Sequence, residues 1–256
     1  MLDGSKLQLP QQFEWDFNVL SGDETTSLMK KVWPRYLIEE SDLQEAPPST
    51  ELTDAELFRR FPMWGIRSKT DQKLVAFASA VLIPMDLTKK TLPDEGWQSA
   101  IQAYFSKFEA NCLCLLSANV DPDFRKLRFS YFLLERAKEL ARSFGFNDVI
   151  APVRPSQKDQ FPSMPMIEYL EKQSDAGEIF DPWLRAHKNL GGEILNVCSQ
   201  SVVIKATLSK WREWTGEALH QSGELLLPKG LVPLKVDVDA NIGIYCEPNV
   251  WVHYRL

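Results

Sequence analysis

The alternation of hydrophobic and polar positions predicts a chain of mixed strands and helices. Period-two alternation and short apolar runs are typical of strands, whereas apolar positions three or four residues apart are typical of helices. The strand patterns cover residues 13–20, 63–67, 73–83, 112–120, 148–153, 193–197 and 201–208. The helical patterns cover residues 24–38 with an interruption near Pro34, 53–61, 97–108, a segment that ends at Gly145, and 182–190. Residues 209–256 add a short Trp-rich helix and one or two strands.

The order of these elements predicts an α+β fold. Strand 112–120, the helix after it and strand 148–153 form a βαβ crossover, in which the two strands are parallel. A hairpin over residues 63–83 and another over residues 193–208, turning at 198–200, add antiparallel strands. We therefore expect a single domain with a mixed central β-sheet flanked by helices. Its core fold covers residues 13–208, and residues 209–256 form a C-terminal extension packed on it.

Composition and charge exclude several classes of protein. With 44% apolar residues and eight Trp, the 256 residues are sufficient for one well-packed domain. The net charge is −6, whereas nucleic-acid-binding domains usually carry a basic surface. No apolar run is long enough to cross a membrane, and residues 1–6 lack the pattern of a signal peptide. We expect a cytoplasmic protein whose partners include neither nucleic acid nor a membrane.

The four cysteines lie in apolar or strand-like segments, at Cys112, Cys114, Cys198 and Cys246. Cys112 and Cys114 would share one face of a strand, and no neighbouring His or Cys completes a zinc site. We therefore expect reduced core thiols and no metal. An acyl-cysteine intermediate is conceivable, but no His partner stands nearby in the sequence.

A basic segment lies between strand 112–120 and the helix that follows it. Arg125, Lys126 and Arg128 precede the helix N-terminus, where the helix dipole already concentrates positive potential. Free backbone amides and the dipole together favour an anion at this position, so a bound phosphate would remove the conflict. A solvated basic loop is the alternative interpretation of the segment taken alone.

Longer segments resemble one branch of the GNAT (GCN5-related N-acetyltransferase) superfamily. They are Ala-Pro-Val-Arg-Pro-Ser-Gln-Lys at 151–158, Phe-Asp-Pro-Trp-Leu-Arg-Ala-His at 180–187, Leu-Gly-Gly at 190–192, Trp-Arg-Glu-Trp-Thr-Gly at 211–216 and Glu-Pro-Asn-Val-Trp at 247–251. This branch includes stand-alone bacterial proteins and the loading-module GNAT domains of polyketide synthases. The resemblance covers roughly residues 55–252 and implies the GNAT acyl-CoA acyltransferase fold.

The resemblance implies that CoA lies along residues 117–130, with its pyrophosphate on the amides of 125–130. The expected binding residues are Ser117, Ala118, Asn119, Val120, Arg125, Lys126, Leu127, Arg128, Phe129 and Ser130. The usual GNAT loop reads Arg/Gln-x-x-Gly-x-Gly/Ala, so Arg128 and Ser130 replace small residues. The Ser130 hydroxyl can bond a phosphate. Arg128 either points outward and pairs with a phosphate, or crowds the amides and weakens binding.

The resemblance also points to catalytic residues. In the polyketide loading domains a His and a Thr are implicated in acyl decarboxylation; His187 matches that His, and Ser156 stands at the Thr position. Decarboxylation of a malonyl thioester leaves an enolate, to which an imidazole of near-neutral pKa can supply a proton. Ser156, or a backbone amide around 117–119, could bond the thioester oxygen. Arg154 is either a binder of the departing carboxylate or a structural ion-pair partner, and a core histidine is the alternative for His187.

The leading hypothesis is an acyl-CoA-dependent acyltransferase. It would move an acetyl or malonyl unit from acetyl-CoA or malonyl-CoA to the thiol of an acyl carrier protein, with or without decarboxylation, as in polyketide biosynthesis. One alternative is an N-acetyltransferase acting on a small amine, in which Tyr169 or a water-linked Glu would serve as acid or base. Another is a degenerate GNAT domain that binds a partner without catalysis, which Arg128 in place of Gly would favour.

Overall fold

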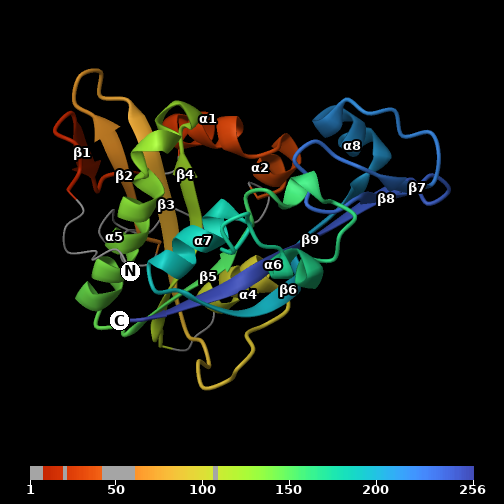
Figure 1. The fold of residues 1–256 in the computed structure, drawn as a ribbon. Helices are drawn as coiled ribbons and strands as arrows, with labels where there is room; N and C mark the ends of the chain where they lie inside the picture. The colour runs from red at the N-terminus through yellow and green to blue at the C-terminus, as the bar shows by residue number, and fades with distance from the viewer. Residues whose placement is uncertain (1–7, 20–21, 42–60, 106–108) are drawn as a thin grey trace.

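The computed structural model describes residues 8–19, 22–41, 61–105 and 109–256 (Figure 1). Within these residues, nine strands form one sheet in the order β1-β2-β3-β4-β5-β9-β8-β7, and β6 pairs with the other edge of β9. Their bounds are β1 Phe13–Asp16, β2 Met63–Ser68, β3 Leu74–Ile83, β4 Cys112–Val120, β5 Asp148–Val153, β6 Glu193–Thr207, β7 Gly223–Leu225, β8 Leu234–Asp237 and β9 Ile242–Arg255. Among the described strands, only β4 and β5 are paired in parallel. The predicted mixed sheet is confirmed.

Helices cover both faces of this sheet. They are α1 Asp23–Val32, α2 Arg35–Ser41, α4 Gly96–Tyr104, α5 Phe129–Ser143, α6 Met166–Glu171, α7 Pro182–Asn189 and α8 Leu208–Thr215, with 3₁₀ turns η2 Pro122–Leu127 and η3 Lys158–Gln160. Successive strand residues point to opposite faces. Val149 of β5 packs in one core with residues of α5 and α7, and Ile150 packs in another with Ala100 of α4. The α5 and α7 face is nearer the viewer in Figure 1, and α4 lies behind the sheet.

The parallel strands β4 and β5 run side by side for a short distance only. Their paired residues are Leu113 with Val149 and Cys114 with Ile150. Beyond these pairs β4 continues along β3 to Val120, whereas β5 continues along β9. A gap therefore opens in the sheet toward the carboxyl ends of both strands, which is where α/β folds place their ligands.

The hairpin predicted for residues 193–208 is wrong. The segment is one long strand, β6, whose partner throughout is β9. The polar residues 198–200 form an irregularity in the pairing instead of a turn, because Ser199 and Gln200 donate their backbone amides to Asp94 at 2.7 and 3.1 Å. A short polar run can be accommodated as a bulge when a residue outside the sheet accepts hydrogen bonds from its amides, here through the side chain and the carbonyl of Asp94.

The C-terminal residues take a larger part in the sheet than the sequence suggests. Residues 209–256 were expected to pack on the core as an extension with one or two strands. They contain β7, β8 and β9, and β9 lies within the sheet between β5 and β6. α8 and the β7–β8 hairpin form a second core, which is centred on Trp211 and Tyr245.

Several other predicted elements are confirmed. The helix break near Pro34 separates α1 from α2, the hairpin over 63–83 is β2–β3, and the crossover is β4–α5–β5. The helix predicted for 53–61 lies almost entirely outside the described residues. The four thiols are free. Burial raises the pKa of Cys112 to about 12 and also raises the pKa of Cys114, so neither is a ready nucleophile.

Candidate active site

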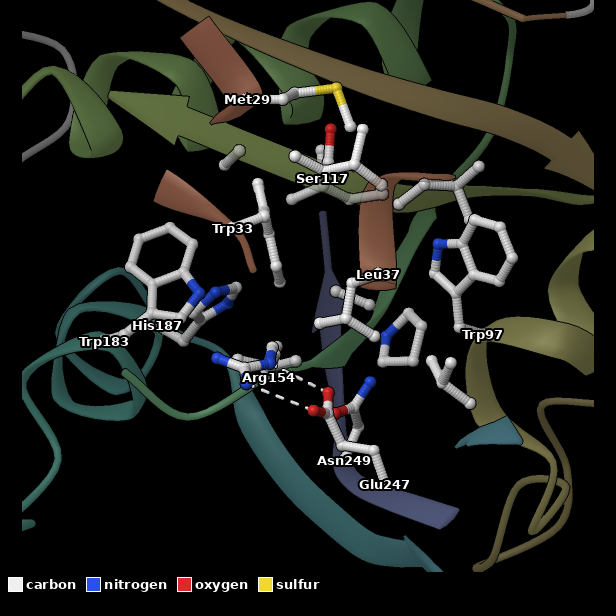
Figure 2. A pocket seen from close by; sticks show the side chains of 18 of the residues that line it. Met29, Trp33, Leu37, Trp97, Ser117, Arg154, Trp183, His187, Glu247 and Asn249 are labelled. Atoms are coloured by element: carbon white, nitrogen blue, oxygen red, sulfur yellow. Dashed lines mark hydrogen bonds and ion pairs between the residues drawn. The ribbon is translucent and has the colours of Figure 1, made fainter. Parts of the chain in front are cut away.

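A cavity of about 150 Å³ occupies the gap between β4 and β5 (Figure 2). Strand residues 115–118 and 151–154 line it from the two sides of the gap. Its apolar walls also come from both faces of the sheet: Met29, Trp33, Leu37, Ile38, Trp97, Trp183, Val202 and Ile204. The polar side chains that reach it are Ser117, Arg154, His187, Glu247 and Asn249. An apolar cavity with a few convergent polar groups is typical of a small-molecule site.

Helix α7 places His187 at this cavity. The Asp181 carboxylate caps the helix by accepting the amides of Trp183 and Leu184, and Pro182 occupies the first helical position, as predicted. His187 lies one turn after Trp183, and the two rings meet edge to face at 4.3 Å. The imidazole is only 1% exposed. Burial, with a smaller contribution from the charge of Lys138, lowers the pKa of His187 to about 3.

The tautomer of His187 follows from its partner. Nδ1 lies 2.7 Å from the Tyr254 hydroxyl, and Nε2 is buried with no hydrogen-bond partner. Burial raises the pKa of Tyr254, so its hydroxyl stays protonated. The Tyr254 hydroxyl has no other partner in the part of the chain that the structure describes, so we assign it as the donor to Nδ1. The neutral ring then carries its proton on Nε2, as an unused donor.

This state differs from the near-neutral imidazole expected from the sequence. A group with a pKa of about 3 is almost never protonated at pH 7, so it is a poor proton donor to carbon. A neutral Nε2–H can instead donate a hydrogen bond to an oxygen on which negative charge develops. The geometry therefore favours His187 as an electrophilic group over His187 as a general acid.

Arg154 and Glu247 form an ion pair at the cavity (Figure 2). Arg154 Nε and Nη2 lie 2.8 and 3.1 Å from the Glu247 carboxylate oxygens, and Nη2 also donates to the carbonyl of Lys229 at 2.6 Å. The Tyr245 hydroxyl donates to the same carboxylate at 2.5 Å. Of the two roles considered for Arg154, the ion pair is thus present in the structure. Nη1 takes part in none of the hydrogen bonds among the described residues.

Asn249 and Ser117 add two further polar groups. Asn249 Nδ2 donates to the buried Ser201 hydroxyl at 2.8 Å, which leaves its carbonyl oxygen Oδ1 buried and without a partner. The Ser117 hydroxyl pairs with Ser79 at 2.8 Å and accepts from Asn119 at 3.1 Å. Ser117 is therefore already satisfied, whereas Asn249 is not. A buried polar atom without a partner in an otherwise apolar cavity is a position where a ligand can bond.

Ser156 lies apart from these groups. It is exposed, it does not line the cavity, and its hydroxyl lies 3.3 Å from the nearer carboxylate oxygen of Asp181. Tyr169 donates to the same carboxylate at 2.8 Å and is likewise absent from the cavity wall. Both side chains thus surround the cap of α7. Ser156 thus contacts the N-terminal cap of α7, whereas His187 lies in the last turn of that helix.

The loop between β4 and α5 carries the predicted anion site. Arg128 precedes α5 with φ of 56°, a left-handed conformation that favours glycine. Its side chain is exposed and its guanidinium lies 5.9 Å from the Tyr131 ring centroid, which corresponds to the outward-pointing alternative. None of the hydrogen bonds in the described part of the chain uses the amides of Phe129 or Ser130. Exposed Arg125 and Lys126 flank these free amides.

Asp121 fixes the start of this loop. It is almost fully buried, accepts the amide of Asp123 at 3.2 Å, and is ion-paired with Lys31 at 2.7 Å and Lys73 at 3.0 Å. Burial alone would raise the pKa of Asp121, but the hydrogen bonds from Lys31 and Lys73 outweigh it and lower the pKa to about 2. The carboxylate thus ties α1 and the residue before β3 to the end of β4.

Sequence reasoning did not identify Asn249, Glu247 or Tyr254 as site residues. The segment 247–251 was recognised only for its resemblance, although it places two polar residues at alternate positions before the apolar end of β9. Polar residues at positions 247 and 249 of a central strand indicate a site, because buried polar side chains need hydrogen-bond partners. Tyr254 gave no comparable signal.

The chain is similar in sequence or in fold to several known proteins. No family model matches the chain. The arginine N-acetyltransferase avaD of Aspergillus versicolor is 29% identical over 251 residues, covering 88% of this chain and 85% of the relative. Among solved structures, the GphF GNAT-like decarboxylase in complex with isobutyryl-CoA has a TM-score of 0.51 at 19% identity, covering 91% of this chain and 93% of that chain. The loading GNATL domain of CurA from Lyngbya majuscula has a TM-score of 0.49 at 15% identity, covering 95% and 97%.

No helix among the described residues is long and apolar enough to span a membrane. No group of three or more His, Cys, Asp or Glu side chains among them could hold a metal ion. The fold itself is identified by two observations: a crossover whose parallel strands separate beside the start of α5, and the likeness to the GphF structure. This chain has the fold of the GNAT superfamily.

Proposed function

We propose that this protein is an acyl-CoA-dependent acyltransferase whose reaction takes place in the cavity between β4 and β5. The observation that carries the proposal is the unused Nε2 of His187 in that cavity. The cavity also lies at the carboxyl end of β4, whose following loop offers free amides and cations to a pyrophosphate. CoA bound along residues 117–130 would bring its thioester into the gap.

The acceptor that we favour is a small amine. The relative with 29% identity over most of the chain is an arginine N-acetyltransferase, which supports an amine over a carrier-protein thiol. The cavity is small, lies across the sheet, and has a wall on the α1, α2 and α4 side that is separate from His187. Such an arrangement suits a thioester approaching from one face and a small acceptor held on the other.

The proposed chemistry is direct acyl transfer. The amine nitrogen attacks the thioester carbon, a C–N bond forms, and the C–S bond breaks with its electron pair on sulfur. The proton lost by the amine balances the thiolate, so the products are an amide and the CoA thiol. The Nε2–H of His187 donates to the carbonyl oxygen as negative charge develops, and Tyr254 holds the ring in that tautomer.

Transfer to a carrier protein with decarboxylation is the second candidate. Arg154 favours it, since a guanidinium beside the thioester could bind the malonyl carboxylate. Against it, the low pKa of His187 leaves few imidazolium ions to protonate the enolate, and Ser156 stands away from the cavity. Intact-mass spectrometry of a holo carrier protein incubated with malonyl-CoA or acetyl-CoA tests this candidate directly.

Two measurements test the main proposal. Calorimetry with CoA should show binding, and release of the CoA thiol from acetyl-CoA should depend on an added amine. The variant His187→Asn retains an acceptor for Tyr254 but removes Nε2, so turnover should fall about 10²–10³-fold while CoA affinity hardly changes. Absence of CoA binding to the wild-type protein would leave only the non-catalytic interpretation.

A further inference from the structure

Two residues that line the cavity each have a buried polar atom with no partner among the described residues. One atom is Nε2 of His187, which carries a proton and donates. The other is Oδ1 of Asn249, a carbonyl oxygen, which can only accept. The proposed transfer uses the first and assigns no role to the second. Asn249 is only 4% exposed, so its unpaired oxygen costs free energy unless a ligand bonds to it.

Neighbouring groups fix the orientation of the Asn249 amide. Its Nδ2 donates to the hydroxyl oxygen of Ser201 at 2.8 Å, and the same oxygen accepts the backbone amide of Trp97 at 2.9 Å. Ser201 is fully buried, and these two bonds fill both acceptor positions of its oxygen. The amide is therefore held by its nitrogen, and Oδ1 is the atom that remains for a ligand.

Asn249 and His187 reach the cavity from opposite faces of the sheet. Trp251, two residues after Asn249 on β9, packs in the core that contains Ala100 of α4, whereas Val250 packs in the core of α5 and α7. Side chains of a strand alternate between its faces, so Asn249 belongs to the α4 face. His187 comes from α7 on the other face, and Figure 2 shows the two side chains entering from different sides. The cavity thus has a donor from one face and an acceptor from the other.

This pair of groups matches what acyl transfer to an amine requires. The thioester oxygen becomes negative as the C–N bond forms, and Nε2–H of His187 can donate to it. The attacking nitrogen becomes positive in the same step and still carries N–H, so an acceptor oxygen beside it is favourable. Oδ1 of Asn249 is such an acceptor, on the face opposite His187.

A thiol acceptor does not suit the same oxygen. Its sulfur attacks as a thiolate, which has lost its only proton and cannot donate to Oδ1. The carbonyl oxygen and the thiolate would place two electron-rich atoms together. The ion pair at the cavity adds no net positive charge to attract the thiolate, because Glu247 neutralises Arg154. Oδ1 of Asn249 therefore disfavours a thiol at the position where it favours an amine.

We propose that Asn249 selects a primary amine over a thiol as the acyl acceptor, by accepting a hydrogen bond from the attacking nitrogen at Oδ1. The inference rests on the proposed acyltransferase function and adds to it the residue that decides the class of acceptor. Ser201 acts as a positioning residue, because it holds the Asn249 amide by its nitrogen. The apolar walls of the cavity, such as Leu37 and Trp97, suit the carbon skeleton of the amine.

Matched pairs of acceptors test the selection. Isoamylamine and phenethylamine are each compared with the thiol of the same carbon skeleton, and the acetyl amide or thioester formed from acetyl-CoA is measured by mass spectrometry. Asn249→Leu removes Oδ1 with little change in volume. A lost hydrogen bond to a charged group corresponds to a fall of about 10–100-fold in kcat/KM for the amines. The values for the thiols should stay the same or rise, so the amine-over-thiol ratio should fall about tenfold or more.

The outcomes separate this inference from the proposed function. An unchanged ratio in Asn249→Leu, with unchanged CoA affinity, would overturn the selection and leave the acyltransferase proposal intact. Transfer by the wild-type protein to the thiols alone, or to none of these acceptors although CoA binds, would likewise overturn the selection. Absence of both transfer and CoA binding would overturn both proposals.

Two further variants distinguish selection from structural damage. Asn196→Leu is the matched control, because the Asn196 amide bonds the backbone of Leu92 and Val197 and does not line the cavity. It should lower the melting temperature and leave the ratio unchanged. Asn249→Asp keeps an acceptor oxygen, so its amine-over-thiol ratio should be no lower than that of the wild type, even if Asn249→Leu fails to fold. A ratio that falls in Asn249→Asp, or falls equally in Asn196→Leu, would overturn the selection.

Discussion

The buried neutral state of His187 predicts a specific dependence of stability on pH. In the folded protein the pKa of His187 is lowered to about 3 by burial and by Lys138, whereas in the unfolded chain it is about 6.5. Between these two values the unfolded state binds more protons than the folded state. The free energy of unfolding therefore rises with pH through this window. The contribution of His187 to it is fully present above about pH 6.5 and is lost as the pH falls toward the folded-state pKa.

The size of the effect follows from the same two values. Each pH unit below the unfolded pKa costs about 1.4 kcal/mol, so lowering the pH from 8 to 5 should destabilise the protein by about 2 kcal/mol through His187 alone. Asp121 does not obscure this window, because its pKa is lowered to about 2 and its contribution is lost only in more acidic solution.

Urea unfolding followed by Trp fluorescence at pH 8, 6 and 5 measures the slope. His187→Asn removes the titrating group but retains an acceptor for the Tyr254 hydroxyl, so it serves as the reference. The wild-type protein should lose about 2 kcal/mol more than His187→Asn over this range. Identical slopes for the two proteins would refute the buried neutral imidazole, and with it the assignment of Nε2–H as a fixed donor.

Other predictions concern residues around the cavity and the loop. Arg128→Gly should raise the free energy of unfolding by about 1 kcal/mol in urea titrations, because Arg128 occupies a left-handed conformation at φ 56°, and calorimetry should show CoA binding weakened less than about tenfold at physiological salt. Tyr254→Phe leaves Nδ1 of His187 without a donor, so thermal unfolding should show a loss of about 1–2 kcal/mol and turnover should fall at unchanged CoA affinity. Asp121→Asn should destabilise by about 1–3 kcal/mol at pH 7, because Lys31 and Lys73 lose their shared carboxylate, and the difference from wild type should vanish toward pH 2. Ser156→Ala should leave turnover nearly unchanged, since the hydroxyl is exposed and contacts only the helix cap; a large loss would restore Ser156 to the catalytic residues.

Local signals in the sequence accounted for much of the fold. The strands over 112–120 and 148–153 and the helix at 182 have strong local causes: continuous apolar runs, an Asp cap and a Pro at the first helical position. The prediction of a hairpin at β6 was wrong because the local pattern there conflicts with the long-range pairing. Residues 198–200 look like a turn, yet the long-range pairing with β9 and the partner Asp94 hold them in a strand. A turn is encoded by its own residues, whereas a bulge depends on a partner far away in the sequence.

The site residues likewise differ in whether local sequence or the assembled fold determines their role. His187 was identifiable because a resemblance marked it, but its neutral state comes from burial and from the charge of Lys138 on α5, and its tautomer is set by Tyr254 on β9. Arg154 and Asn249 are 95 positions apart and become neighbours only through the register of β5 with β9. Whether a buried polar atom has a partner is a property of the assembled core, not of the residue. The unused atoms that carry the functional argument are therefore visible only after the strands are paired, and a pairing shifted by one residue would turn Asn249 to the opposite face of the sheet, away from the cavity that it lines.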